Sequence, residues 1–122
     1  MESSQVCQGG STLIFACSGA ADVGAVADGA ARKLSQQGVG SMFCLAGIGG
    51  RIEPILKKTA AAAKILAIDG CPLNCVKGTL EQAGFTQFEH LQLADLGLAK
   101  GQTPPTAENI ARAAAKGMEL LA

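Results

Sequence analysis

The sequence is poor in aromatic and charged residues. It has no Trp or Tyr and four Phe, and its ten basic residues balance ten acidic ones, which gives a formal net charge of zero. Nucleic-acid-binding proteins usually carry an excess of Lys and Arg, often beside aromatic side chains that stack on bases. Here no basic run is longer than two residues, as at Lys57 and Lys58. We therefore expect no nucleic-acid partner.

The sequence also lacks a long apolar run. Apolar stretches such as 13–16 and 65–68 are far shorter than the roughly 18 residues that a membrane helix needs. The first ten residues are mostly polar and do not have the basic start and long apolar stretch of a secretory signal. We therefore expect a soluble cytoplasmic protein with no membrane association.

What the chain has is enough apolar material for one core. It is 122 residues long and 48% hydrophobic, and a chain of this size removes about two thirds of its unfolded surface from water. A hydrophobic chain without net charge is not expected to be disordered. No linker-like segment divides it, so the sequence predicts a single domain over residues 1–122.

Three segments repeat one pattern, in which a short β-rich apolar stretch is followed by a cysteine, a glycine-containing turn and a helical periodicity. The expected strands end near Cys17, Cys44 and Cys71, at two equal intervals of 27 residues, a spacing that suits a βα unit. A partly polar fourth strand is expected at 86–93, as an exposed edge, and a last helix after the prolines at 104–105. The pattern predicts a three-layer α/β/α domain with a mainly parallel four-stranded sheet in (βα)4 order.

The expected helices have ordinary start and stop signals. Ser18 is expected to cap the first helix, Pro54 to begin the second and Pro72 to begin the third. Gly38 and Gly84 are expected to end the first and third.

The cysteines are the chemically distinctive residues of this sequence. Because right-handed crossovers make successive strands parallel, Cys17, Cys44 and Cys71 should gather at the edge where open α/β sheets bind ligands. A helix beginning at Pro72 would place Cys75 beside Cys71 in its first turn. Thiols stay reduced in the cytoplasm, and four thiolates suit tetrahedral zinc, although an iron–sulfur cluster uses the same ligands. We predict a zinc site made of Cys17, Cys44, Cys71 and Cys75.

Cys7, Asp69, Asp95 and His90 are not expected to be metal ligands. Cys7 precedes the first strand and is expected to be a bystander thiol. Asp69 is expected either to stabilise the turn at Gly70 or to orient the metal ligands, and Asp95 to be a turn or capping residue. His90, the one histidine of the sequence, lies within the fourth strand and is expected to point away from the cysteines.

Two enzymatic alternatives use the same edge. Clustered thiolates also serve thiol–disulfide chemistry or the handling of soft metals and metalloids, although the cysteine pair with two-residue spacing typical of thioredoxins is absent. The segment from Cys44 to Arg51 could cradle an oxyanion, but it has six intervening residues where low-molecular-weight phosphatases have five. We expect Arg51 to cap a helix or meet solvent. Whether the protein is an enzyme stays open at this point.

Three motifs of the sequence resemble the DGC-domain family of small prokaryotic proteins. They are residues 17–24, 43–50 and 69–75. The resemblance covers nearly the whole chain, and the third motif contains the Asp-Gly-Cys triplet that names the family. The family is described as having four cysteines that bind zinc, and the resemblance implies this role for Cys17, Cys44, Cys71 and Cys75. It implies no activity, substrate or protein partner, and no oligomeric state.

Overall fold

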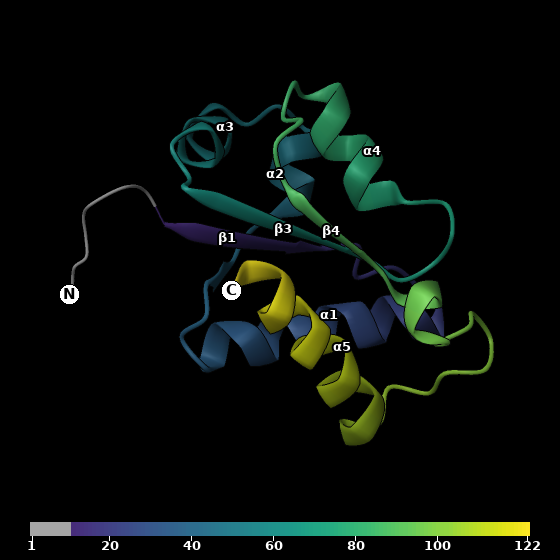
Figure 1. Cartoon of the computed structure of the whole chain (residues 1–122). Coiled ribbons are helices and arrows are strands. Elements are labelled where there is room, and N and C mark those ends of the chain that lie inside the picture. Colours follow the sequence, from purple (N-terminus) through teal and green to yellow (C-terminus); the bar gives the residue numbers. More distant parts are fainter. Residues whose placement is uncertain (1–10) are drawn as a thin grey trace.

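Four parallel strands form the centre of the molecule (Figure 1). In the computed structural model, which describes residues 11–122, they are β1 (Thr12–Ala16), β2 (Ser41–Met42), β3 (Lys64–Asp69) and β4 (Glu89–Gln92). Their order across the sheet is β2-β1-β3-β4, and all three pairings are parallel. The predicted α/β fold with a four-stranded parallel sheet is therefore confirmed. The expectation for Cys7 lies outside the described residues.

Helices cover both faces of this sheet. They are α1 (Asp22–Gln36), α2 (Leu45–Gly49), α3 (Glu53–Ala60), α4 (Cys75–Gln82) and α5 (Ala107–Leu121), together with the 3₁₀ helix η1 (Leu93–Leu96). Figure 1 shows α1 and α5 side by side on one face, and α2, α3 and α4 on the other. The three predicted layers are present, but α2 and α3 stand where one helix was expected. In residues 11–122, no helix has both the length and the apolar character needed to cross a membrane.

Both edge strands are shorter than the sequence suggests. β4 lies at one edge of the sheet, as predicted, but it spans four residues instead of 86–93. β2 forms the other edge and has only two residues. Cys44 therefore does not end a longer strand, and one residue, Phe43, separates it from the end of β2.

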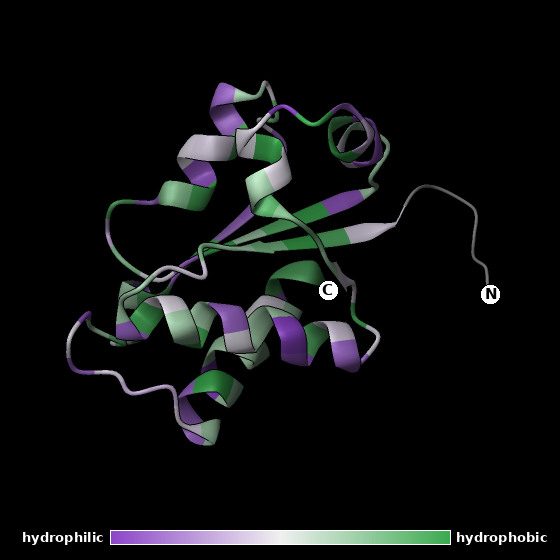
Figure 2. Cartoon of the chain, turned by 180° about the vertical axis from the view of Figure 1, so that it is seen from behind, coloured by the Kyte–Doolittle hydropathy of each residue, from purple (hydrophilic) through white to green (hydrophobic). Residues whose placement is uncertain are grey.

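Buried apolar side chains fill the space between the sheet and the helices on each side. Ile14, Leu66 and Ile68 belong to the core under α1 and α5, whereas Leu13 and Phe15 belong to the core under α2 and α4. Side chains along a strand alternate between its two faces, so the central strands β1 and β3 are apolar almost throughout. Figure 2 shows this as mostly green central strands, flanked by helices that carry both green and purple segments.

The first helix starts later than expected. α1 begins at Asp22, and Ser18 does not cap it; Ser18 adopts a left-handed conformation with φ 50°, and its hydroxyl donates to Asp28. The expectations for Pro54, which lies in the first turn of α3, and for Gly38, which follows α1 with φ 77°, are confirmed.

The third predicted helix also begins later than expected. α4 begins at Cys75, because the residues after Pro72 form a turn in which Asn74 adopts a left-handed conformation with φ 56°. Cys71 lies in this turn, before the helix. The two cysteines therefore do not share the first turn of a helix, and the prediction that Pro72 begins it was wrong. Gly84 follows the end of α4 with φ 94°, as predicted.

Candidate functional site

The chain connections create one crevice at the C-terminal edge of the sheet. β1 continues into α1 on one face and β3 continues into α4 on the other, so the connections diverge between these two neighbouring strands (Figure 1). Open α/β sheets bind their ligands outside the carboxyl ends of the strands, at such a switch point. The ends of β1 and β3 are therefore the expected ligand-binding position.

Three of the four predicted cysteines lie around a pocket at this position. Cys17 follows β1, Cys71 is the second residue after β3, and Cys75 is the first residue of α4. The pocket has a volume of about 300 Å³, and Lys100 and small residues from 19–24 complete its wall. Cys17 and Cys71 are half-buried and Cys75 is exposed, so a small ligand can reach all three thiols. We call these residues the three-thiol pocket.

Two glycines allow the Asp-Gly-Cys turn to pack directly on the first turn of α1. A Cβ added to Gly70 would lie 2.4 Å from the carbonyl oxygen of Val23, and one added to Gly24 would lie 2.6 Å from the carbonyl oxygen of Gly19. Neither glycine has a positive φ, so glycine is needed at these positions for space and not for backbone conformation. The close approach brings the end of β3 against the loop that follows Cys17.

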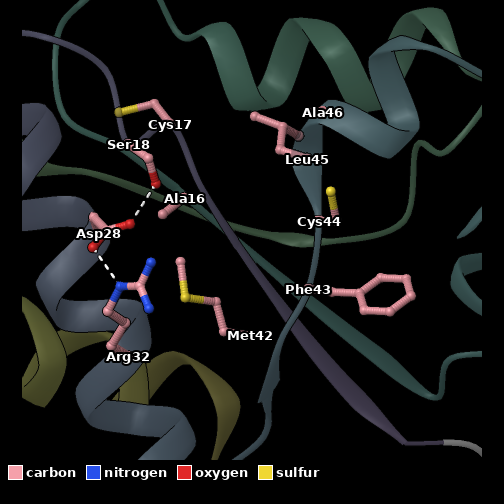
Figure 3. Close-up of a pocket in the computed structure, with 10 residues that line it drawn as sticks. All are labelled: Ala16, Cys17, Ser18, Asp28, Arg32, Met42, Phe43, Cys44, Leu45 and Ala46. Atoms are coloured by element: carbon pink, nitrogen blue, oxygen red, sulfur yellow. Dashed lines mark hydrogen bonds and ion pairs between the residues drawn. The ribbon is translucent and has the colours of Figure 1, made fainter.

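Backbone hydrogen bonds fix Cys17 against the end of β3. Its amide donates to the carbonyl oxygen of Ile68 at 3.2 Å, and the amide of Gly70 donates to the Sγ atom of Cys17 at 3.4 Å. The Gly70 hydrogen bond orients the sulfur toward the three-thiol pocket. In Figure 3 the Sγ atom of Cys17 is turned away from Cys44.

The carboxylate of Asp69 fixes the start of α4, which carries Cys75 on the opposite side of the pocket from Cys17. It is 1% exposed and accepts hydrogen bonds from the amides of Val76 at 2.8 Å and Lys77 at 3.1 Å. These amides lie in the first turn of α4, where the helix itself offers no acceptor. His90 Nε2 lies 2.8 Å from Asp69 Oδ2. Asp69 therefore caps α4 from the preceding strand and fixes the start of the helix that carries Cys75.

This contact corrects the expectation for His90, which does not point away from the cysteine edge. β3 and β4 pair in a register that sets Asp69 opposite Gln92, and residue 90 lies two positions earlier on the same face. For Asp69, the sequence predicts either stabilisation of the turn at Gly70 or orientation of the metal ligands, and the structure does not show the first of these. Its oxygens accept from α4 instead, while the Gly70 amide donates to Cys17.

Cys44 lies apart from the other three thiols. It is exposed, immediately precedes α2, and lines a second pocket of about 710 Å³ that Cys17 also borders (Figure 3). Within residues 11–122, no group of three or more His, Cys, Asp or Glu side chains is arranged to hold a metal ion. The soft thiolate donors suit zinc chemically, but their present arrangement does not form a closed zinc site. The four-cysteine site stays a prediction.

Arg51 does not cradle an anion beside Cys44. Its Nη1 donates to the carbonyl oxygen of Ile48 at 2.8 Å, and its Nη2 donates to that of Gln82 at 3.2 Å. These carbonyls lie near the C-terminal ends of α2 and α4, so Arg51 caps two helices, as expected. The phosphatase alternative loses the group that would bind phosphate. Asp95 lies exposed in η1 and borders neither pocket.

The structure adds a residue that no sequence pattern singles out, Asp22 at the start of α1. Its carboxylate accepts hydrogen bonds from the amides of Gly101 and Thr103, each at 2.9 Å. These hydrogen bonds, that from Gly101 first, hold the pKa of Asp22 below its ordinary value. They tie loop 97–106 to α1, and this loop carries Lys100 to the three-thiol pocket. No local sequence pattern connects residues 79 positions apart.

Comparisons with known proteins agree with the sequence motifs. The family model described as DGC domain matches residues 13–116. A curated relative, the anaerobic and virulence modulator AnvM of Pseudomonas aeruginosa, is 39% identical over 88 residues, which cover 72% of this chain and 67% of AnvM. No solved structure matches the chain significantly. The chain belongs to the DGC domain family.

Proposed function

We propose that the chain is a thiol-based zinc-binding protein whose site lies at the crevice between β1 and β3. Its ligands are Cys17, Cys71 and Cys75, with Cys44 as the fourth. The observation that carries the proposal is the shared pocket of three thiols at the switch point of the sheet. Thiolates are soft donors that zinc prefers, and a reducing cytoplasm, where we expect the protein to be, keeps them available.

The proposal requires Cys44 to approach the other three thiols. Cys44 is exposed and lies in the short connection between β2 and α2. Its neighbours Phe43 and Leu45 pack against the core, so this approach requires the connection to change its conformation. The zinc-free and zinc-loaded proteins should therefore differ around residues 43–46. AnvM is named as a modulator, and a segment whose position depends on bound metal would give this chain a means of modulating a partner.

Metal content and thiol protection test this proposal. We expect protein purified without added zinc to hold about one zinc ion per chain and to show four thiols that become reactive only after chelation. Replacing Cys17, Cys44, Cys71 or Cys75 by Ser should lower zinc affinity at least tenfold each, and Cys7→Ser is the matched control that should not. A metal-free, stably folded protein with reactive thiols contradicts the proposal. A brown protein with visible absorption would indicate that the cysteines hold an iron–sulfur cluster instead of zinc.

Thiol redox chemistry is the second candidate, and the openness of the three-thiol pocket favours it. Cys71 and Cys75 flank one short turn and are not enclosed by other ligands. In this reaction two thiols form one disulfide, and the two electrons and two protons reduce a low-molecular-weight disulfide to two thiols. Equilibration of zinc-free protein with oxidised and reduced glutathione, followed by mass spectrometry, tests it. A protein that stays fully reduced across the cytosolic range of potentials rules this candidate out. The same thiols suit soft metals and metalloids, which the zinc titration can include as competitors.

A further inference from the structure

The pocket beside Cys44 has a polar wall that neither zinc binding nor thiol chemistry uses. The wall is built by Asp28 and Arg32, one turn apart on α1, and by Ser18 after β1. The other walls are formed by side chains from β1, β2 and the start of α2. They are Ala16, Cys17, Met42, Phe43, Cys44, Leu45 and Ala46. The pocket therefore combines one polar wall with a mainly apolar and sulfur-containing surface (Figure 3).

Asp28 holds the guanidinium of Arg32 in a fixed orientation. Arg32 Nε donates to one carboxylate oxygen at 2.6 Å, and the Ser18 hydroxyl donates to the other at 2.8 Å. Ser18 makes this contact from a left-handed backbone conformation, φ 50°, which is unfavourable for a residue with a Cβ. The strained serine thus supports the carboxylate that positions the arginine.

The ion pair leaves the end of the guanidinium unused. It engages Nε only, and no hydrogen bond joins Nη1 or Nη2 of Arg32 to another of residues 11–122. Figure 3 shows both terminal nitrogens on the Met42 side of the guanidinium carbon, one directed toward the side of Asp28 and Ser18 and the other away from it. Two terminal N–H groups in one plane match the two oxygens of a carboxylate or phosphate.

We propose that this pocket binds a small organic monocarboxylate, with its two oxygens on the terminal nitrogens of Arg32 and its apolar part against Met42 and Leu45. Asp28 balances the charge of Arg32, so recognition depends on two directed hydrogen bonds more than on net positive charge. This favours a singly charged carboxylate over a phosphate dianion, whose second charge would meet the Asp28 carboxylate. The apolar walls favour a ligand with a short hydrocarbon chain over a free inorganic anion.

Titration of the reduced, zinc-free full chain with hexanoate tests the proposal, followed by amide NMR shifts at constant ionic strength. The absence of zinc makes the outcome independent of the metal proposal. We expect saturable binding with the largest shifts at Ser18, Cys44 and Leu45. Hexanamide, which keeps the chain but loses the charge, and inorganic phosphate, which lacks the chain, should bind at least tenfold more weakly.

Variants of Arg32 separate the two-nitrogen contact from general attraction. The Arg32 side chain is 64% exposed, so Arg32→Gln should fold normally and lose at least tenfold in hexanoate affinity. Arg32→Lys keeps the charge but cannot present two coplanar donors, and it should lose nearly as much. Lys57→Gln is the matched control, because it removes one positive charge and one ion pair to a residue four positions away, Glu53, on α3. It should bind hexanoate as the wild type does.

Several outcomes would overturn the proposal. Unchanged affinity in Arg32→Gln, or an equal loss in Lys57→Gln, would show that the pocket does not recognise the anion. Wild-type affinity for hexanoate in Arg32→Lys would show that charge attraction, and not the two-nitrogen contact, accounts for binding. Phosphate binding as tightly as hexanoate would exclude a carboxylate ligand with an apolar chain.

Discussion

Asp69 on β3 and His90 on β4 are joined by a contact of 2.8 Å between Oδ2 and Nε2. The same carboxylate, 1% exposed, also accepts two amides from the first turn of α4. A buried carboxylate is tolerated only where its oxygens find hydrogen-bond donors. One side chain therefore connects a central strand, an edge strand and the helix that begins with Cys75.

Removing this carboxylate should destabilise the fold. Asp69→Ala leaves the amides of Val76 and Lys77 without their acceptor and makes a small cavity, so we expect the free energy of unfolding to fall by about 3 kcal/mol. Urea unfolding followed by circular dichroism measures it. Asp95→Ala, at an exposed position, is the control and should stay within about 0.5 kcal/mol of the wild type. Equal stability of the two variants would contradict the anchoring role of Asp69.

The sheet and the gathering of three of the four cysteines, Cys17, Cys71 and Cys75, could be predicted because they follow from repetition along the chain. Apolar stretches at a regular spacing implied parallel strands, and parallel strands bring their C-terminal ends to one edge. The positions of Cys17 and Cys71 at neighbouring strand ends confirm that reasoning. The place of Cys44 was less predictable, because β2 stops at Met42 and a short helix takes up the residues after it.

Helix starts and long-range contacts could not be predicted in the same way. Pro72 is compatible with a helix start, but Asn74 adopts a left-handed conformation and delays the helix to Cys75. The hydrogen bonds from Gly101 and Thr103 to Asp22 join segments whose proximity only the finished fold creates. A single sequence carries no local signal for such pairs.

The glycine of the Asp-Gly-Cys turn should be irreplaceable because of space. A methyl group at Gly70 would meet the carbonyl of Val23 at 2.4 Å, and backbone must shift to relieve the clash. We expect Gly70→Ala to lower the free energy of unfolding by about 2 kcal/mol or more. Gly78→Ala, inside α4 with no atom within 4 Å of the added Cβ, is the control and should raise stability by about 0.5–1 kcal/mol. The idea fails if Gly70→Ala unfolds at the same denaturant concentration as the wild type.

Arg51 allows side-chain hydrogen bonds to be separated from backbone strain. It adopts a left-handed conformation with φ 58° while its guanidinium binds carbonyls of Ile48 and Gln82. Arg51→Ala loses the hydrogen bonds and keeps the strain, so we expect a loss of about 1–2 kcal/mol in urea unfolding. Arg51→Gly loses the same bonds but relieves the strain, and should recover about 1 kcal/mol of that loss. A glycine variant less stable than the alanine variant would mean that strain at this position is unimportant.

The contacts of Asp22 make the attachment of loop 97–106 dependent on pH. The hydrogen bonds from Gly101 and Thr103 lower the pKa of Asp22 in the folded protein, so its contribution to stability is complete above the unfolded pKa of about 3.9. It is lost as the pH falls through the lower folded pKa.

Asp22→Asn should therefore be less stable than the wild type at pH 7, and the difference should shrink as the pH falls below about 4. Urea unfolding between pH 7 and pH 3 measures this, and the amides of Gly101 and Thr103 should exchange faster with solvent in the variant. A stability difference that does not change across this range would mean that the charge of Asp22 does not hold the loop, and with it Lys100, at the three-thiol pocket.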